Sequence, residues 1–184
     1  MYSNVNKIPE KIEHSEIFSE LYNKYFPKLY KYTLYKVGDC YIAEDLVSEI
    51  FEKMLVNYNA YSPEKGNFST WLYTVANNHI INYLKKNNYI TNYTKIEKTV
   101  EAKYRLEDLI IDRELKEYLL KAIMCLDERQ RNIIALKFGA SLTNRQIAQV
   151  INVTESNVGT ILYRSLKQLK EILQEQGIVY KRVG

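Results

Sequence analysis

The stretch that most constrains the fold runs from Leu142 to Leu173 and reads LTNRQIAQVINVTESNVGTILYRSLKQLKEIL. Its pattern predicts two helices joined by a tight corner. Thr143 and Gln146 have the spacing of a capping box, which marks the start of a helix. Asn152 stands where the chain must turn, and asparagine tolerates the left-handed conformation that ends a helix. Thr154 can then cap the second helix.

The second helix of this pair has two contrasting faces. Its apolar stripe consists of Val158, Ile161, Leu162, Ser165, Leu166, Leu169, Ile172 and Leu173. Its opposite face carries hydrogen-bond donors and cations: Ser156, Thr160, Tyr163, Arg164, Lys167 and Lys170. A helix-turn-helix places such a face in the major groove of DNA, with the cations on phosphates. An ordinary helical hairpin with a solvated polar face is the alternative, because short helix-turn-helix patterns also arise by chance.

The rest of the chain has the same helical character. Glycine and proline are scarce, at six and three among 184 residues, and apolar residues recur at helical spacing throughout. We therefore predict an all-α protein. The length allows one or two domains. The net charge of +4 permits nucleic-acid binding without requiring it.

Composition also bears on the compartment. Cys40 and Cys125 are far apart and lack the spacing of metal ligands, which favours two thiols in a reducing compartment. The N-terminus has no apolar core typical of a signal peptide. No apolar run reaches the roughly 18 residues that a transmembrane helix needs. We expect a cytoplasmic protein that does not insert into the membrane.

Changes in periodicity divide the chain into segments. We expect a loose N-terminus over residues 1–14, a helical domain over 15–87, a flexible linker over 88–105, a second helical domain over 106–176 and a tail over 177–184. Ser15 can cap the first helix, and Pro27 is expected to break or kink it. Gly38 is a natural terminator for its continuation. Leu126 and Asp127 are expected to open a further helix that closes at Gly139.

The helix after Gly38 has an acidic side formed by Glu44, Asp45, Glu49 and Glu52. Paired carboxylates invite a catalytic or metal-binding interpretation, but no histidine, second acidic cluster or glycine-rich phosphate loop accompanies them. We expect no enzymatic site, no metal and no cofactor. A solvated acidic face is the simple interpretation, and a docking surface for a basic partner helix is the more specific one.

A polar loop over residues 57–67 precedes another amphipathic helix. The loop is long enough to carry a function. The helix is expected to turn Asn77, Asn78, Asn82, Lys85 and Lys86 away from its apolar stripe. Amides and lysines beside an aromatic-bearing loop suit single-stranded DNA, although a solvated helix would look the same. His79 falls on the apolar side, which indicates a core or boundary residue.

Three motifs occur in order along the chain. The first is AEDLVSEIF at Ala43–Phe51, and the second is F-x-x-W-L-x-x-x-A-x-N from Phe68 to Asn78. The third is an L-x-x-x-x-R pattern followed by Ile147-Ala148 and the Asn157-Val158 helix start. Together they resemble bacterial RNA polymerase sigma factors of the sigma-70 family, in the extracytoplasmic-function (ECF) group. The resemblance covers the chain from about Phe18 to Leu173.

The resemblance implies a region 2 helical bundle and a region 4 helix-turn-helix joined by a flexible linker. Region 2 would dock on the clamp coiled coil of the polymerase β′ subunit through Glu44, Asp45, Leu46, Ser48, Glu49 and Glu52. Region 2 would also recognise and melt the minus-ten element through Tyr61, Lys65, Asn67, Asn77, Asn78, Asn82, Lys85 and Lys86. Region 4 would meet the β flap and read the minus-thirty-five element through Ser156, Asn157, Thr160, Arg164 and Lys167.

The expected function is transcription initiation with core RNA polymerase and promoter DNA as partners, and an anti-sigma factor is a further partner that the family allows. The sequence departs from the family at two places. Gly159 and Ile161 replace basic residues that many members carry in the recognition helix. Asn77 and His79 stand where arginines are frequent, so no promoter sequence can be carried over. The alternatives are a stand-alone operator-binding regulator, or a helical adaptor that never touches DNA.

Overall fold

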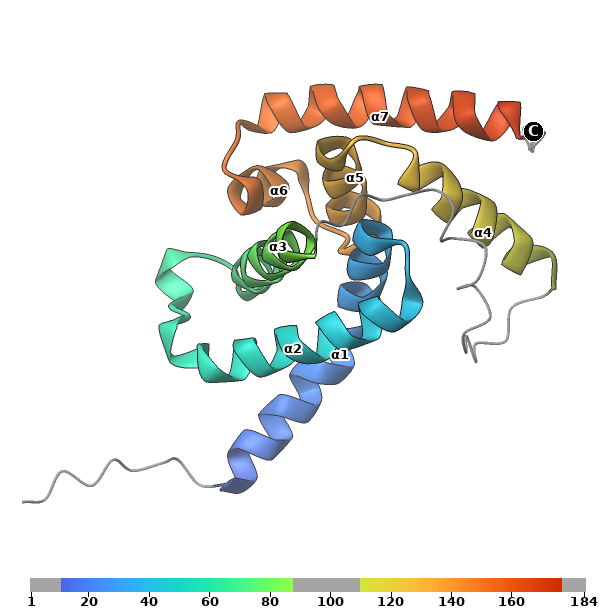
Figure 1. The fold of residues 1–184 in the computed structure, drawn as a ribbon. Helices are drawn as coiled ribbons and strands as arrows, with labels where there is room; N and C mark the ends of the chain where they lie inside the picture. Colours follow the sequence, from blue (N-terminus) through green and yellow to red (C-terminus); the bar gives the residue numbers. More distant parts are fainter. Residues whose placement is uncertain (1–10, 88–109, 177–184) are drawn as a thin grey trace, which may run out of the picture.

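The structure is a computed structural model that describes residues 11–87 and 110–176. Every regular element in those two ranges is helical (Figure 1). The predicted linker at 88–105 and the tail at 177–184 lie outside the described residues. The elements in chain order are α1 (Lys11–Val37), α2 (Cys40–Val56), η1 (Tyr58–Ala60), η2 (Pro63–Lys65), α3 (Phe68–Lys86), α4 (Ile110–Met124), α5 (Glu128–Ile134), η4 (Ala135–Gly139), α6 (Asn144–Ile151) and α7 (Glu155–Glu175).

Helix α1 differs from its prediction in two ways. It begins at Lys11 instead of Ser15, and it continues through Pro27 without interruption. Proline removes one backbone N–H, which leaves the carbonyl of Asn23 without its helical partner. Both Asn23 and Pro27 are exposed, so water can satisfy that carbonyl. The helix ends as expected at Gly38, which has a φ of 73°.

The other helix boundaries follow the local signals. Asp39 caps α2 by accepting the N–H groups of Tyr41 and Ile42 at 2.9 and 3.0 Å. The capping box of Thr143 and Gln146 is formed at the start of α6, and another at Asp127 opens α5 as predicted. After α5 the chain makes one π-helical turn, η4, that ends at Gly139.

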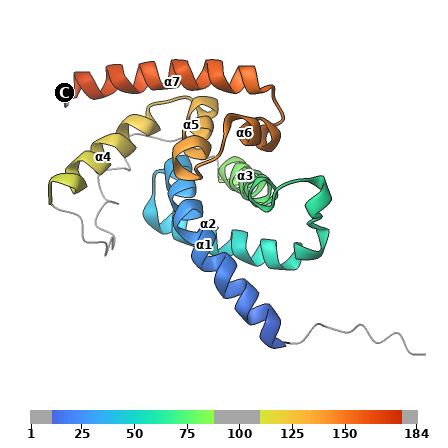
Figure 2. The same cartoon turned by 180° about the vertical axis from the view of Figure 1, so that it is seen from behind.

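The predicted corner between α6 and α7 is also present. Asn152 ends α6 in the left-handed conformation, with φ 53° and ψ 57°. Helix α7 then crosses over α4, α5 and α6 (Figures 1 and 2). The centre of its apolar stripe is buried, but Leu166 was expected there and is 43% exposed. The stripe is wider than the surface that the three underlying helices cover.

The two helical lobes, α1–α3 and α4–α7, share one hydrophobic core. Buried residues of the first lobe such as Leu29 and Tyr73 belong to the same cluster as Ile133, Leu136 and Ile147 of the second. Helix α1 packs against η4, and α3 packs against α6. The figures show α3 directly beside α6 from both sides. In this structure the lobes therefore form one packed unit.

Gly139 lies at a close contact between the lobes. A Cβ atom added there would lie 2.7 Å from the Cα atom of Tyr32 in α1. Only a residue without a side chain allows η4 to pack against the backbone of α1 in this way.

A buried polar network crosses the same interface. The Tyr32 hydroxyl faces the Oδ1 atoms of Asn77 and Asn132 at 3.2 and 3.4 Å, and Asn132 donates its amide to Asn77 at 3.0 Å. Lys36 is 2% exposed and its Nζ has no hydrogen-bond partner among the described residues. Burial lowers the pKa of Lys36 to about 8, and Arg131 adds to this effect while Glu128 opposes it.

Candidate nucleic-acid and partner interfaces

The first part of α7 presents a continuous polar face. Thr154 caps the helix by accepting the N–H of Asn157 at 3.2 Å. The predicted contact residues are all exposed: Ser156, Asn157, Thr160, Arg164 and Lys167. Lys167 lies 4.0 Å from Glu171, but both side chains are exposed, so this pair holds the lysine only weakly. The face is therefore open to solvent along the first half of α7.

An open pocket of about 450 Å³ lies at the start of this face, and it includes a residue that the sequence did not suggest. Arg129, from the first turn of α5, donates from Nη2 to Oδ1 of Asn157 at 3.1 Å. Twenty-eight positions separate the two residues in the chain. The scarcity of cations in the recognition helix was the one available hint that another element supplies charge. The pocket is lined by Arg129, Thr154, Ser156, Asn157, Thr160, Ile161 and Arg164.

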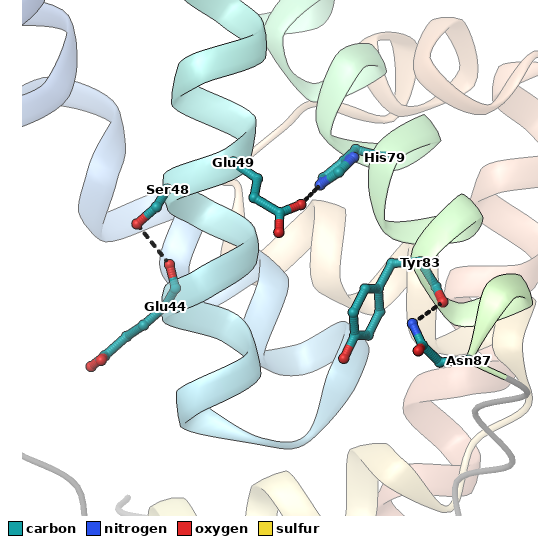
Figure 3. Close-up of polar contacts among 6 residues, drawn as sticks. All are labelled: Glu44, Ser48, Glu49, His79, Tyr83 and Asn87. Atoms are coloured by element: carbon teal, nitrogen blue, oxygen red, sulfur yellow. Dashed lines mark hydrogen bonds and ion pairs between the residues drawn. The ribbon is translucent and has the colours of Figure 1, made fainter.

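Helix α2 turns its acidic side to solvent. Glu44, Asp45, Ser48, Glu49 and Glu52 are all exposed. The hydroxyl of Ser48 donates to the carbonyl of Glu44 at 3.1 Å, one turn earlier in the helix (Figure 3). This side of α2 thus presents carboxylates and could bind a basic partner.

Leu46 does not belong to that surface, contrary to the expectation from the family. It is only 1% exposed and lies in the shared core. Its helical position places it on the same side as Ala43, Val47 and Ile50, which all face the interior. In this structure its side chain is therefore not part of the exposed acidic surface.

The acidic side of α2 is tied to α3 by one short contact. The Nε2 atom of His79 lies 2.6 Å from Oε2 of Glu49 (Figure 3). The His79 side chain is 15% exposed, which confirms that it is a boundary residue. Glu49 is therefore held toward α3 and is less free than Asp45 or Glu52 to meet a partner.

Helix α3 exposes most of its predicted DNA-facing residues. Asn78, Asn82, Lys85 and Lys86 are exposed. Asn77 is the exception, because it is 5% exposed and belongs to the network with Tyr32 and Asn132. Its predicted exposure is wrong, since the second lobe packs over its side of α3.

The loop before α3 is ordered by aromatic contacts. The ring of Tyr61 packs edge-on against the ring of Phe68, with 5.2 Å between their centroids, and its centroid lies 5.5 Å from that of the Trp71 ring. The Tyr61 hydroxyl donates to the carbonyl of Gly66 at 3.3 Å. Asn67 caps α3 by accepting the N–H of Ser69 at 2.9 Å, so it has a structural role. The half-buried rings lie at the N-terminal end of the amide-bearing helix and offer surfaces on which bases can stack.

The side chain of Lys65 lies outside the described residues.

The Asn87 amide donates to the carbonyl of Tyr83 at 2.9 Å, which closes the C-terminal end of α3 (Figure 3).

Within residues 11–87 and 110–176, no three histidine, cysteine, aspartate or glutamate side chains are grouped as metal ligands would be. Burial raises the pKa of both the Cys40 and the Cys125 thiol, which favours the neutral form. Among the described helices, none is long and apolar enough to span a bilayer.

These features define a two-lobed helical protein with a helix-turn-helix in its second lobe and an acidic helix in its first. Residues 21–89 match the family model of Sigma-70 region 2, and residues 116–169 match that of Sigma-70 region 4. The chain belongs to the sigma-70 family, in its ECF group.

Two curated relatives show the extent of the similarity. The ECF RNA polymerase sigma factor BldN of Streptomyces coelicolor is 28% identical over 163 residues, which are 88% of this chain and 62% of that protein. The ECF RNA polymerase sigma factor SigW of Bacillus subtilis is 27% identical over 170 residues, covering 87% of this chain and 90% of the relative.

Solved structures share the fold. The sigma factor RpoE of Bartonella quintana, solved in complex with the anti-sigma factor NepR, superposes with a TM-score of 0.69 at 18% identity. That match covers 86% of this chain and 98% of RpoE. CnrH, solved with the cytosolic domain of CnrY, gives a TM-score of 0.65 at 15% identity, with coverage of 88% and 90%.

Proposed function

We propose that this chain is a transcription initiation factor that binds core RNA polymerase in the cytoplasm and directs it to specific promoters. One observation carries the proposal. A single chain of the sigma-70 family presents an exposed acidic helix, an amide- and lysine-bearing helix beside aromatic rings, and a helix-turn-helix with an exposed polar and basic face. Relatives named as ECF RNA polymerase sigma factors align over most of its length. Catalysis belongs to the polymerase.

The acidic side of α2 is the proposed polymerase-docking surface. Glu44 and Asp45 are exposed at its N-terminal end, and Glu52 extends it along the helix. A carboxylate surface of this kind attracts a basic partner, steers its approach and fixes its register. The β′ clamp coiled coil is the partner that the family implies.

Region 2 is the proposed site of strand opening. Tyr61, Phe68 and Trp71 form a half-buried aromatic cluster at the N-terminal end of α3. Stacking of an unpaired base on such a ring contributes about 1–3 kcal/mol, which helps to offset the cost of unpairing. Asn78 and Asn82 offer amides to base edges, and the lysines at the end of α3 offer charge to phosphates.

Region 4 is the proposed upstream DNA-binding element. Ser156 and Thr160 are exposed at the start of α7, where a helix-turn-helix would place them in the major groove, and the exposed Arg164 and Lys167 would follow toward the phosphates. Phosphate contacts of this kind fix the orientation of the protein on the duplex, and they make binding weaken as salt rises.

The packed lobes have a consequence for this function. The minus-ten and minus-thirty-five elements are by their names about 25 base pairs apart, which is roughly two and a half turns of duplex, whereas α3 packs directly against α6 of the helix-turn-helix. We therefore propose that the lobes separate when both elements are read together. Separation would also release Asn77 from Asn132.

Run-off transcription with purified core polymerase tests the proposal. The template set contains the promoter of this protein's own operon and a broad sample of genomic fragments. We expect the chain to confer defined start sites on an enzyme that lacks its specificity subunit. No start-site selectivity on any template would reject the proposal. Tight operator binding in gel shifts without polymerase would favour a stand-alone regulator instead.

A further inference from the structure

The pocket at the start of α7 brings together a sequence anomaly and an unassigned arginine. The recognition helix has Gly159 and Ile161 where many relatives have basic residues, so its own positive charge is low near its start. Arg129 of α5 lines the pocket beside that helix start, and Arg164 lines it one turn beyond Thr160. The exposed Arg129 side chain directly engages Asn157, a predicted base-contacting residue.

The hydrogen bond fixes which way the Asn157 amide points. A guanidinium has only donors, so the atom that faces Arg129 must be the carbonyl oxygen Oδ1. The distance from Nη2 of Arg129 to this oxygen is 3.1 Å. The NH₂ group of Asn157 is therefore on the opposite branch of the amide. The backbone N–H of Asn157 bonds to Thr154, which holds the residue in the first turn of α7.

This orientation limits the bases that Asn157 can read. An unconstrained asparagine pairs with adenine, because its oxygen accepts from N6 while its nitrogen donates to N7. Here Oδ1 of Asn157 already accepts a hydrogen bond from the Arg129 guanidinium. The N6 amine of adenine would have to donate to the same oxygen, which would place its partly positive hydrogen close to the guanidinium charge. Guanine presents only acceptors, N7 and O6, on the purine edge that Asn157 would meet.

We propose that Arg129 is a specificity-determining residue that acts through Asn157, orienting its amide so that the recognition helix favours guanine and disfavours adenine at one upstream position. This inference rests on the proposed function, because it concerns the DNA that region 4 reads. Arg129 acts as a positioning residue, and Asn157 makes the base contact.

A library selection with the complete holoenzyme tests the inference. Core polymerase with the full chain is incubated with duplexes in which the upstream element is randomised, and the bound DNA is sequenced. The variants are Arg129→Ala and Asn157→Ala. The matched control is Arg145→Ala, which removes an exposed arginine of α6 that does not line the pocket. The melting curve of each variant verifies that it is folded.

We expect the wild type to prefer guanine over adenine at the one position where Asn157→Ala loses its preference. Arg129→Ala should shift the ratio of adenine to guanine there by about tenfold toward adenine, the scale of one base contact, and leave other positions unchanged. Arg145→Ala should keep the wild-type base preferences.

A uniform loss of affinity in Arg129→Ala, with unchanged preferences, would overturn the inference, because it would mean a phosphate contact only. A wild-type preference for adenine at the Asn157 position, or no change of preference in Asn157→Ala, would also overturn it. Failure of the wild-type holoenzyme to select any sequence would instead reject the proposed function, and this inference with it.

Discussion

Replacement of Gly139 by alanine places one methyl group at a close backbone contact between the two lobes. The added Cβ atom would lie 2.7 Å from the Cα and 2.8 Å from the N atom of Tyr32, and 3.1 Å from the carbonyl carbon of Lys31. All three are backbone atoms of helix α1, so no side-chain rotation can relieve the overlap. Either α1 or η4 must move, and the packing between the lobes must loosen.

The contact distances indicate the free-energy cost of Gly139→Ala. Overpacking of a well-packed core costs about 1–3 kcal/mol, and we expect the upper end because backbone atoms form the whole contact. Gly159 provides the matched control, since a Cβ atom there meets only the Asn144 amide, at 4.0 Å. Replacement of glycine by alanine inside a helix stabilises the folded protein by roughly 0.5–1 kcal/mol. The two variants should therefore differ by about 4 kcal/mol in their free energy of unfolding.

Urea denaturation of the full chain measures this difference, and small-angle X-ray scattering reports the separation of the lobes. We expect Gly139→Ala to be destabilised, to be more extended, or both, while Gly159→Ala stays compact and becomes slightly more stable. If both variants have the same unfolding free energy and the same scattering profile, the lobes do not pack as described.

Three further predictions concern charged residues. Lys36 has a pKa of about 8 in the folded protein and an ordinary value of 10.5 when unfolded, so its own contribution to the free energy of unfolding should rise from pH 8 to about 10. Burial raises the pKa of Tyr32, Tyr73, Cys40 and Cys125, which opposes this trend, so the Lys36 contribution is measured as the difference between a variant and the wild type. Lys36→Met should exceed the wild type by about 3 kcal/mol in free energy of unfolding at pH 7, and this difference should shrink to below about 1 kcal/mol by pH 10. Urea titrations of both proteins at pH 7, 8, 9 and 10 check this, and a difference that does not change with pH would contradict it. Asp45→Arg should lose the ability to compete for core polymerase while its melting temperature stays unchanged. Glu20→Arg, an equal charge reversal on α1, is the control and should compete normally. Full competition by Asp45→Arg would mean that docking occurs elsewhere. Arg164→Ala should lower the slope of log affinity against log salt for promoter DNA by about one, and an unchanged slope would remove Arg164 from the phosphate contacts.

The sequence by itself determined the features that depend on near neighbours in the chain. The capping boxes at Asp127 and Thr143 and the left-handed turn at Asn152 involve residues within a few positions of one another. The exposed face of α7 likewise follows from the 3.6-residue period of a single helix. For the same reason the all-α class and the order of the motifs could be predicted, and the family comparisons confirm them.

Only the tertiary structure decided what the helices bury against each other. Asn77 carries no local mark that separates it from Asn78, yet it is buried because Asn132, 55 positions away, packs on it. Arg129 reaches Asn157 across 28 positions, and the contact of Gly139 with Tyr32 spans the two lobes. Helical periodicity specifies which side of a helix is apolar, but the polar residues at its margin become buried or exposed according to which distant segment packs there.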